Sequence, residues 1–173
     1  AIPMPVWDAG CAPIDVAALR GRQCFGGLDL ARVRDLSAFV LEFPPLVEGD
    51  PWQVLAWFWL PEDNMQERVH RDHVPYDVWV RDELIETTPG NTTDYRFVGR
   101  RVLELAGLYD IRCIGYDRTF AGELVQDLLA EGIPLKEFGQ GFLSLASPCA
   151  ELLRRVHARQ LQHGGNPVLR WNA

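Results

Sequence analysis

The chain has 173 residues, of which 47% are hydrophobic and 24% charged, and it carries a formal net charge of −7 at pH 7. This length and composition fit one soluble globular domain with a sizeable core. The longest apolar runs, such as residues 54–60, are too short to span a bilayer, so we expect no membrane contact. The acidic balance argues against a protein that binds nucleic acid over its whole surface, but it permits an enzyme that meets DNA along one basic rim.

The four cysteines show no pattern typical of disulfides or zinc sites. Cys11, Cys24, Cys113 and Cys149 form no C-x-x-C pair and no cluster with histidine at zinc-binding spacing. They are typical of reduced thiols, which indicates a cytoplasmic protein. Residues 1–10 also lack the basic start and long apolar stretch of a signal peptide.

The first half of the chain predicts a proline-rich arm followed by three strands. Residues 1–20 form the arm or linker, and Asp15 is placed to cap a short helix within it. The links between the three strands are short, which favours an antiparallel meander. In chain order, the expected elements are strands over 23–30, 36–43 and 52–60, a helix over 62–73, a helical turn over 78–82 and a short strand over 84–88.

The second half alternates helices and strands. Asp94 is placed to cap a helix that ends near Tyr109, and Ser147 followed by Pro148 is typical of the start of a last helix ending near Leu161. A meander followed by parallel strands with crossover helices predicts an α/β fold, an RNase H-like mixed sheet flanked by helices. The other elements expected here are a buried strand over 111–116, a helix over 119–131 and a strand over 133–138.

Two aspartates stand at the ends of strand-like apolar runs, Asp29 at the end of the first strand and Asp117 at the end of the run over 111–116. In the expected sheet the ends of these two strands are neighbours, and ligands bind at such edges. Carboxylates are hard oxygen ligands for a divalent metal. Two metals about 4 Å apart form the arrangement that cleaves phosphodiesters by in-line displacement. The competing interpretation is that each aspartate only forms a turn or a cap.

Other polar residues surround the two aspartates in the sequence. Asp35 could serve as an auxiliary ligand, although a turn aspartate is the favoured interpretation. Arg32 and Arg34 lie in the same turn, and Arg118 follows the second aspartate. Arginines at the rim of a metal site can hold phosphates of the cut strand, or they can balance the acidic cluster, and the two roles are compatible.

The chain resembles the C-terminal nuclease domain of tailed-phage or prophage terminase large subunits, the motors that package DNA. The likeness extends over nearly the whole chain from about residue 21, and it rests on the order and spacing of several short motifs. These motifs are GGLDL (26–30), DLSA (35–38), FWLPE (58–62), VPYDVW (74–79), TPGN (88–91), GYDR (115–118), FGQGF (138–142) and HGGNPVLRW (163–171).

The resemblance implies an endonuclease that cuts concatemeric double-stranded viral DNA in the host-cell cytoplasm. The family's first-strand and fourth-strand acids bind two Mg²⁺ or Mn²⁺ ions, and these catalytic and metal-binding roles transfer to Asp29 and Asp117. The family's third acid lies on a helix beyond the last motif. The sequence ends at Ala173 with no counterpart, so we expect residues 21–173 to be a nuclease domain lacking its C-terminal end.

The implied partners are double-stranded DNA, the terminase ATPase domain, the small terminase subunit and the portal. No phosphate-binding loop of the form G-x-x-x-x-G-K-[ST] occurs, so ATP hydrolysis is not expected of this chain. Two alternatives remain open. The first is a non-catalytic docking module of the packaging motor, and the second is another RNase H-like nuclease of the resolvase or integrase type.

Overall fold

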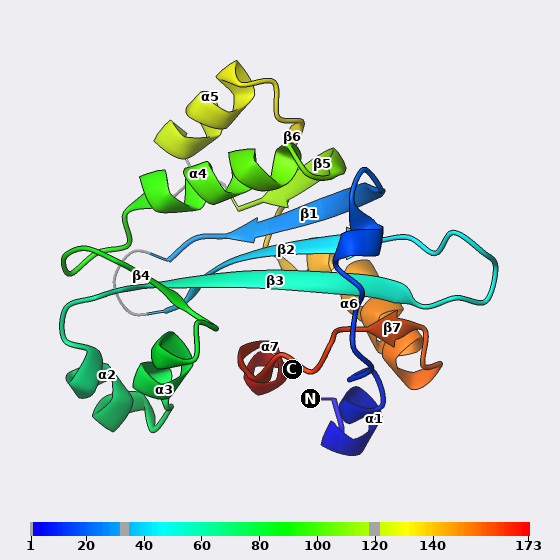
Figure 1. Cartoon of the computed structure of the whole chain (residues 1–173), viewed down its shortest axis with the longest axis horizontal. Helices are drawn as coiled ribbons and strands as arrows, with labels where there is room; N and C mark the ends of the chain where they lie inside the picture. Colours follow the sequence, from blue (N-terminus) through cyan, green and yellow to red (C-terminus); the bar gives the residue numbers. More distant parts are fainter. Residues whose placement is uncertain (1, 32–34, 118–121) are drawn as a thin grey trace.

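A computed structural model describes residues 2–31, 35–117 and 122–173 of the chain. A mixed sheet of seven strands runs through the molecule in the order β4-β3-β2-β1-β5-β6, with β7 paired to β3 (Figure 1). Strands β1, β2 and β3 form the expected antiparallel meander, and β5 and β6 extend it in parallel from β1. The strands are β1 (Gln23–Asp29), β2 (Ser37–Phe43), β3 (Trp52–Pro61), β4 (Glu86–Thr88), β5 (Asp110–Tyr116), β6 (Leu135–Glu137) and β7 (Leu161–Gln162).

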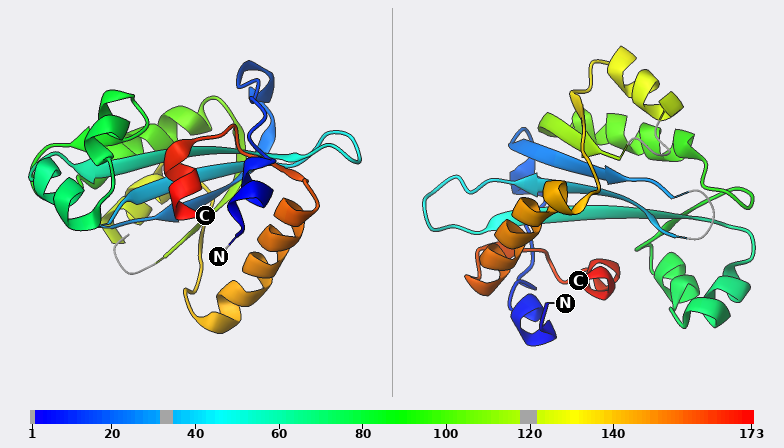
Figure 2. Two further views of the ribbon diagram at one scale, coloured as in Figure 1. Left: turned by 90° about the horizontal axis from the view of Figure 1, so that it is seen from below. Right: turned by 180° about the vertical axis from the view of Figure 1, so that it is seen from behind.

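The helices lie on both sides of this sheet. Helix α4 lies on one side and α6 on the opposite side, as the view from below shows (Figure 2, left). This mixed α/β layout confirms the fold class predicted from the sequence. The helices are α1 (Met4–Asp8), α2 (Met65–Asp72), α3 (Tyr76–Arg81), α4 (Tyr95–Ala106), α5 (Gly122–Ala130), α6 (Phe142–His157) and α7 (Pro167–Asn172), with a 3₁₀ turn η1 (Ala17–Leu19).

Side-chain alternation gives the sheet two different faces. One face, called the core face here, carries large apolar residues and packs against α4 and α5 in the main hydrophobic core. The other, called the open face, carries the residues that alternate with them, and α6 covers only part of it. The core face and its helices include Cys24, Leu28, Phe39, Leu41, Ile114, Val98, Val102, Leu105, Leu124 and Leu128.

Of the two predicted helix caps, Asp94 is confirmed as an N-cap, whereas Asp15 lies one residue before the N-cap position of its turn. The side chain of Asp94 accepts a hydrogen bond from the backbone N–H of Arg96 at the start of α4. The Asp15 carboxylate accepts from the N–H groups of Ala17 and Ala18, which begin η1. Asp94 is therefore the N-cap of α4, whereas the N-cap position of η1 is Val16. In both cases a carboxylate oxygen accepts from a backbone donor that has no partner within the helix.

The predicted start of the last long helix at Ser147 was wrong. Helix α6 begins at Phe142, and Pro148 lies inside it. A proline within a helix removes one backbone hydrogen bond, normally to the carbonyl four residues earlier. Here that carbonyl belongs to Ser144, which is exposed, so water can replace the missing donor.

The two ends of the chain pack against each other, and the termini lie close together (Figure 1). Trp7 stacks on the ring of His163 with 4.1 Å between ring centroids, and the Trp7 carbonyl lies 2.9 Å from Nε2 of that histidine. Arg170 of α7 donates to Asp8 of α1 at 2.7 Å. The arm predicted over residues 1–20 therefore contributes to a small hydrophobic core, while the domain boundary at residue 20 stays a prediction.

No helix in the described part of the chain is long and apolar enough to cross a membrane.

Candidate active site

The parallel pairing of β1 and β5 brings Asp29 and Asp117 to the same edge of the sheet. Leu28 pairs with Tyr116, so the aspartates that follow these two residues lie at the same level on neighbouring strands. On the other side of β1, Asp29 pairs with Ala38 of β2. Paired residues share a face, which places both carboxylates on the open face.

A cleft of about 380 Å³ lies over this part of the open face. Its floor carries small side chains, and the segment between β6 and α6 forms one wall. Asp29 and Asp117 both line it, so the carboxylates face a space that is open to solvent and large enough for part of a ligand. The other lining residues are Gly26, Gly27, Leu28, Ala38, Val40, Gly115, Tyr116, Phe138 and Gln140.

The electrostatics of the cleft disfavour the ionised form of Asp29. Partial burial is the main cause that raises the pKa of this carboxyl, and the charges of Asp117 and Asp35 raise it further. A hydrogen bond from the backbone N–H of Leu30 acts in the opposite direction. A divalent cation bound beside Asp29 would stabilise its ionised form, because the positive charge offsets the repulsion from the neighbouring carboxylates.

The carboxylates of Asp29 and Asp117 are suitable ligands for a hard divalent cation, but two side chains are too few to fill its coordination shell. Within residues 2–31, 35–117 and 122–173, no group of three or more histidine, cysteine, aspartate or glutamate side chains is arranged to hold a metal ion. Asp29 and Asp117 thus supply carboxylate oxygens from two strands, and water or substrate oxygens would fill the remaining positions of a bound Mg²⁺ or Mn²⁺.

The remaining candidate residues differ in how far the structure describes them. Asp35 is exposed, just before β2, and close enough to Asp29 to influence its pKa. Arg32, Arg34 and Arg118 lie outside the described residues. In the last described segment, α7 carries Arg170 and asparagine as its polar residues and no acid.

Sequence reasoning missed the glycines of the cleft floor. Gly27 pairs with Gly115 across β1 and β5, and each glycine lies two residues before an acid of the pair. A strand repeats its side-chain direction every two residues, so each glycine faces the same way as the acid that follows it. The signal that could have found them is the pattern Gly-x-Asp, which occurs at the end of both strands.

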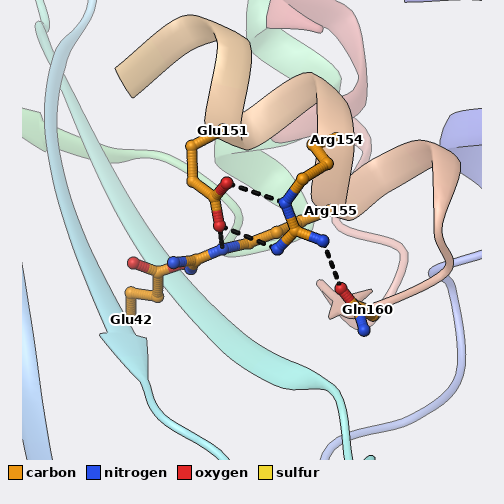
Figure 3. Close-up of polar contacts among 5 residues, drawn as sticks. All are labelled: Glu42, Glu151, Arg154, Arg155 and Gln160. Atoms are coloured by element: carbon orange, nitrogen blue, oxygen red, sulfur yellow. Dashed lines mark hydrogen bonds and ion pairs between the residues drawn. The ribbon is translucent and has the colours of Figure 1, made fainter. Parts of the chain in front are cut away.

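Next to the cleft, an ion-pair network holds α6 against the open face (Figure 3). Arg155 of α6 bridges Glu151 of the same helix and Glu42 of β2, and its guanidinium lies 3.7 Å above the ring of Trp52. The groove between α6 and the sheet has a volume of about 500 Å³ and shares Gly26, Gly27 and Val40 with the cleft.

Comparison with known proteins shows which family the chain resembles in sequence and structure. A family model described as "Terminase large subunit, endonuclease domain" matches residues 2–173. Over 167 residues, the chain is 36% identical to the terminase large subunit of Enterobacteria phage HK97, an alignment that covers 95% of this chain and 32% of that protein. The crystal structure of the HK97 bacteriophage large terminase superposes with a TM-score of 0.85 and 34% identity, covering 98% of this chain and 35% of that chain. This chain therefore spans about a third of the length of these relatives.

Proposed function

The chain belongs to the family of terminase large subunit endonuclease domains, and we propose that it is a metal-dependent endonuclease whose centre is formed by Asp29 and Asp117. The observation that carries this proposal is the register of β1 against β5. It places two carboxylates at one level on neighbouring strands, at an edge where sheets of this kind bind ligands. The raised pKa of Asp29 supports the same assignment, because perturbed acids in clefts are typical of functional sites.

In this proposal Asp29 and Asp117 would hold Mg²⁺ or Mn²⁺ ions, with Asp29 as the more central ligand because β1 is flanked by β2 and β5 in the sheet. Bound ions of this kind would supply an activated water and stabilise charge on the leaving 3′ oxygen. Asp35 would act from the segment just before β2 as an auxiliary acid, through water or by charge alone. Arg32, Arg34 and Arg118 would hold phosphates of the cut strand.

The substrate in this proposal is concatemeric double-stranded DNA, cut at the start and end of genome packaging. The ATPase domain, the small terminase subunit and the portal would be its partners in a packaging motor. A net charge of −7 implies that the isolated domain binds DNA weakly, because like charges repel the phosphate backbone. The rest of a motor would then deliver DNA to the cleft.

The first test is cleavage of supercoiled plasmid in the presence of Mn²⁺. We expect the wild-type chain to nick and linearise the plasmid, and Asp29→Ala to reduce the rate at least about 100-fold, because it removes a central charge of the site. Circular dichroism should show the same fold for both proteins, since this side chain faces solvent rather than the core. A variant that cuts at the wild-type rate would contradict the assignment of Asp29.

The docking alternative is favoured by one feature of α6. Phe142 and Leu143 at its first turn are 96% and 97% exposed, which is unusual for large apolar side chains on a protein surface. Binding of purified portal that is lost in a Phe142→Ser, Leu143→Ser double variant, with no Mn²⁺-dependent cleavage by the wild type, would support docking as the main role.

A further inference from the structure

Lys136 is the only lysine of the chain, and it lies on β6 beside the candidate active site. Its neighbour Leu135 packs against the main core, so the alternation of the strand turns Lys136 to the open face. In the parallel pairing of β5 and β6, Lys136 pairs with Gly115, two residues before Asp117. The lysine therefore shares a face with the acid pair and lies on the strand next to β5.

The strand positions between Lys136 and β1 carry no side chain of their own. Phe138 lies beside them as a wall of the cleft, and a Cβ atom added at Gly115 would meet Phe138 Cβ and the Gly26 carbonyl oxygen at 3.9 Å. The residues that follow Lys136 in register across the sheet are Gly115 and then Gly27. A Cβ atom added at Gly27 would meet no atom within 4 Å, which shows how open the surface is at this point. Adjacent strands are about 4.8 Å apart, so the four-carbon stem of a lysine can reach across β5 towards the acids.

The ammonium group of Lys136 is also free of the ion pairs that occupy most cations here. Most arginines of the described residues pair with an acid, including Arg155 beside the same face. Within the described part of the chain, the Lys136 side chain makes no hydrogen bond or ion pair, and the residue is exposed. An exposed, unpaired cation next to acids that would hold metal is suited to a second anionic group of the substrate.

We propose that Lys136 binds a backbone phosphate of the DNA strand being cut, next to the phosphate that would lie at the metal site formed by Asp29 and Asp117. This inference rests on the proposed function, because it takes nucleic acid as the ligand of the cleft. Lysine acts as a point charge towards phosphate, so the contact would position the strand without reading its sequence. The small floor residues would let the sugar–phosphate chain pass close to the sheet between the two contacts.

The first experiment measures binding of a short duplex DNA by fluorescence anisotropy, with Ca²⁺ as the metal so that binding is separated from cleavage. We expect Lys136→Gln to weaken binding about fivefold and to reduce the slope of log K against log salt by about one, the value for one lost phosphate contact. Lys136→Arg should keep near wild-type binding, because it preserves the charge.

The matched control is Arg159→Gln. Arg159 is also exposed and makes no ion pair within the described residues, but it follows α6 near the start of β3, at the opposite end of the sheet from Asp29. Removing its charge should leave both the affinity and the salt slope unchanged. An equal loss in both variants would show that only net charge matters, and it would overturn the assignment of Lys136.

A second experiment uses the chain without mutation. Because Lys136 is the only lysine, an amine-reactive acetylating reagent modifies one side chain, apart from the terminal amine. Duplex DNA with Ca²⁺ should slow its acetylation severalfold, as measured by mass spectrometry of the peptide that contains it. The terminal amine of the same chain serves as the internal reference.

The outcomes separate this inference from the proposed function. If Asp29→Ala abolishes cleavage while Lys136→Gln binds and cuts like wild type and DNA leaves acetylation unchanged, the endonuclease stands and the role of Lys136 is refuted. If the wild type neither binds nor cuts DNA, both proposals fall. Weaker binding by Lys136→Gln, a lower salt slope and DNA protection of the amine would together establish the contact.

Discussion

The two faces of the sheet are formed by the same strands but differ in how tightly their residues are packed. On β1, the Cβ position of Gly26 points into the core and that of Gly27 points into open space above the cleft floor, although the two glycines are neighbours and both line the cleft. A Cβ atom at Gly26 would lie 2.8 Å from Ile114 Cγ1 and 3.1 Å from Phe39 Cε2, whereas one at Gly27 would meet nothing within 4 Å. Packing therefore requires glycine at position 26 on the core face, whereas the open face has room for a larger side chain at position 27.

This difference separates the residues that stabilise the fold, on the core face, from the residues proposed to act in cleavage, on the open face. The core face is filled to the density of a protein interior, so its residues are constrained by their neighbours. The open face has small residues, one exposed and one half-buried aspartate and a partly covering helix, none of which the core needs. Substitutions on the two faces should accordingly affect different measurements.

The largest effect on stability should come from breaking the core face at Gly26. We expect Gly26→Val to lower the free energy of unfolding by about 3 kcal/mol, because the added methyl groups overpack Ile114 and Phe39. Gly27→Val should leave stability unchanged or slightly higher, since valine favours strands and has room there. Its side chain enters the cleft beside Asp29, so plasmid cleavage should fall. Urea denaturation measures the free energy of unfolding of both variants. Equal destabilisation by the two substitutions would refute the predicted difference between the core face and the open face.

A smaller effect is expected where α6 meets the open face. Arg155 lies between Glu42 and Glu151, and burial is the main cause that raises the pKa of Glu42 despite this partner. Arg155→Leu should cost about 1–2 kcal/mol, because it leaves the charge of Glu42 partly buried without compensation. Arg154→Leu is the matched control. Arg154 is more exposed and pairs only with Glu151 among the acids, so its loss should destabilise the chain less than the loss of Arg155.

The smallest effect concerns the contribution of Asp29 to the pH dependence of the free energy of unfolding. Because the pKa of Asp29 is raised above 3.8 in the folded chain, its ionisation destabilises the fold as pH rises through that higher value. Asp29→Asn should therefore be as stable as wild type below about pH 3.8. Near neutral pH, without divalent metal, it should be more stable by a few tenths of a kcal/mol, since solvent screens this exposed group.

Thermal melts from pH 3 to 8 with and without Mn²⁺ test this prediction. Added Mn²⁺ should raise the melting temperature of wild type more than that of Asp29→Asn, because binding to the folded state stabilises it. A stability difference that is largest at low pH would contradict the sign derived for Asp29.

Much of the fold could be predicted because its signals are local. The three meander strands, the strand that leads to Asp117 and the N-cap at Asp94 follow from alternation, short links and one capping side chain. The family resemblance correctly identified the nuclease domain. The start of α6 could not be found, because Ser147 followed by Pro148 imitates a cap, and solvent tolerates the lost hydrogen bond there.

Helix α1 was missed for a different reason. Its five residues are too few to form a helix by local propensity, and they are held by the stacking of Trp7 on His163 and the pairing of Asp8 with Arg170. These partners lie more than 150 residues away in the chain. No sequence window short enough to show periodicity contains both sides of such contacts.

The sequence by itself determined that acids stand at the ends of two strands, each with a glycine two positions before it, and that these strands belong to a mixed sheet. Only the tertiary structure decided that Leu28 pairs with Tyr116, that the open face remains partly uncovered, and that Lys136 shares that face with both acids. The physical reason is that side-chain direction within a strand is a local property with a period of two. Register between strands depends on packing across the whole core.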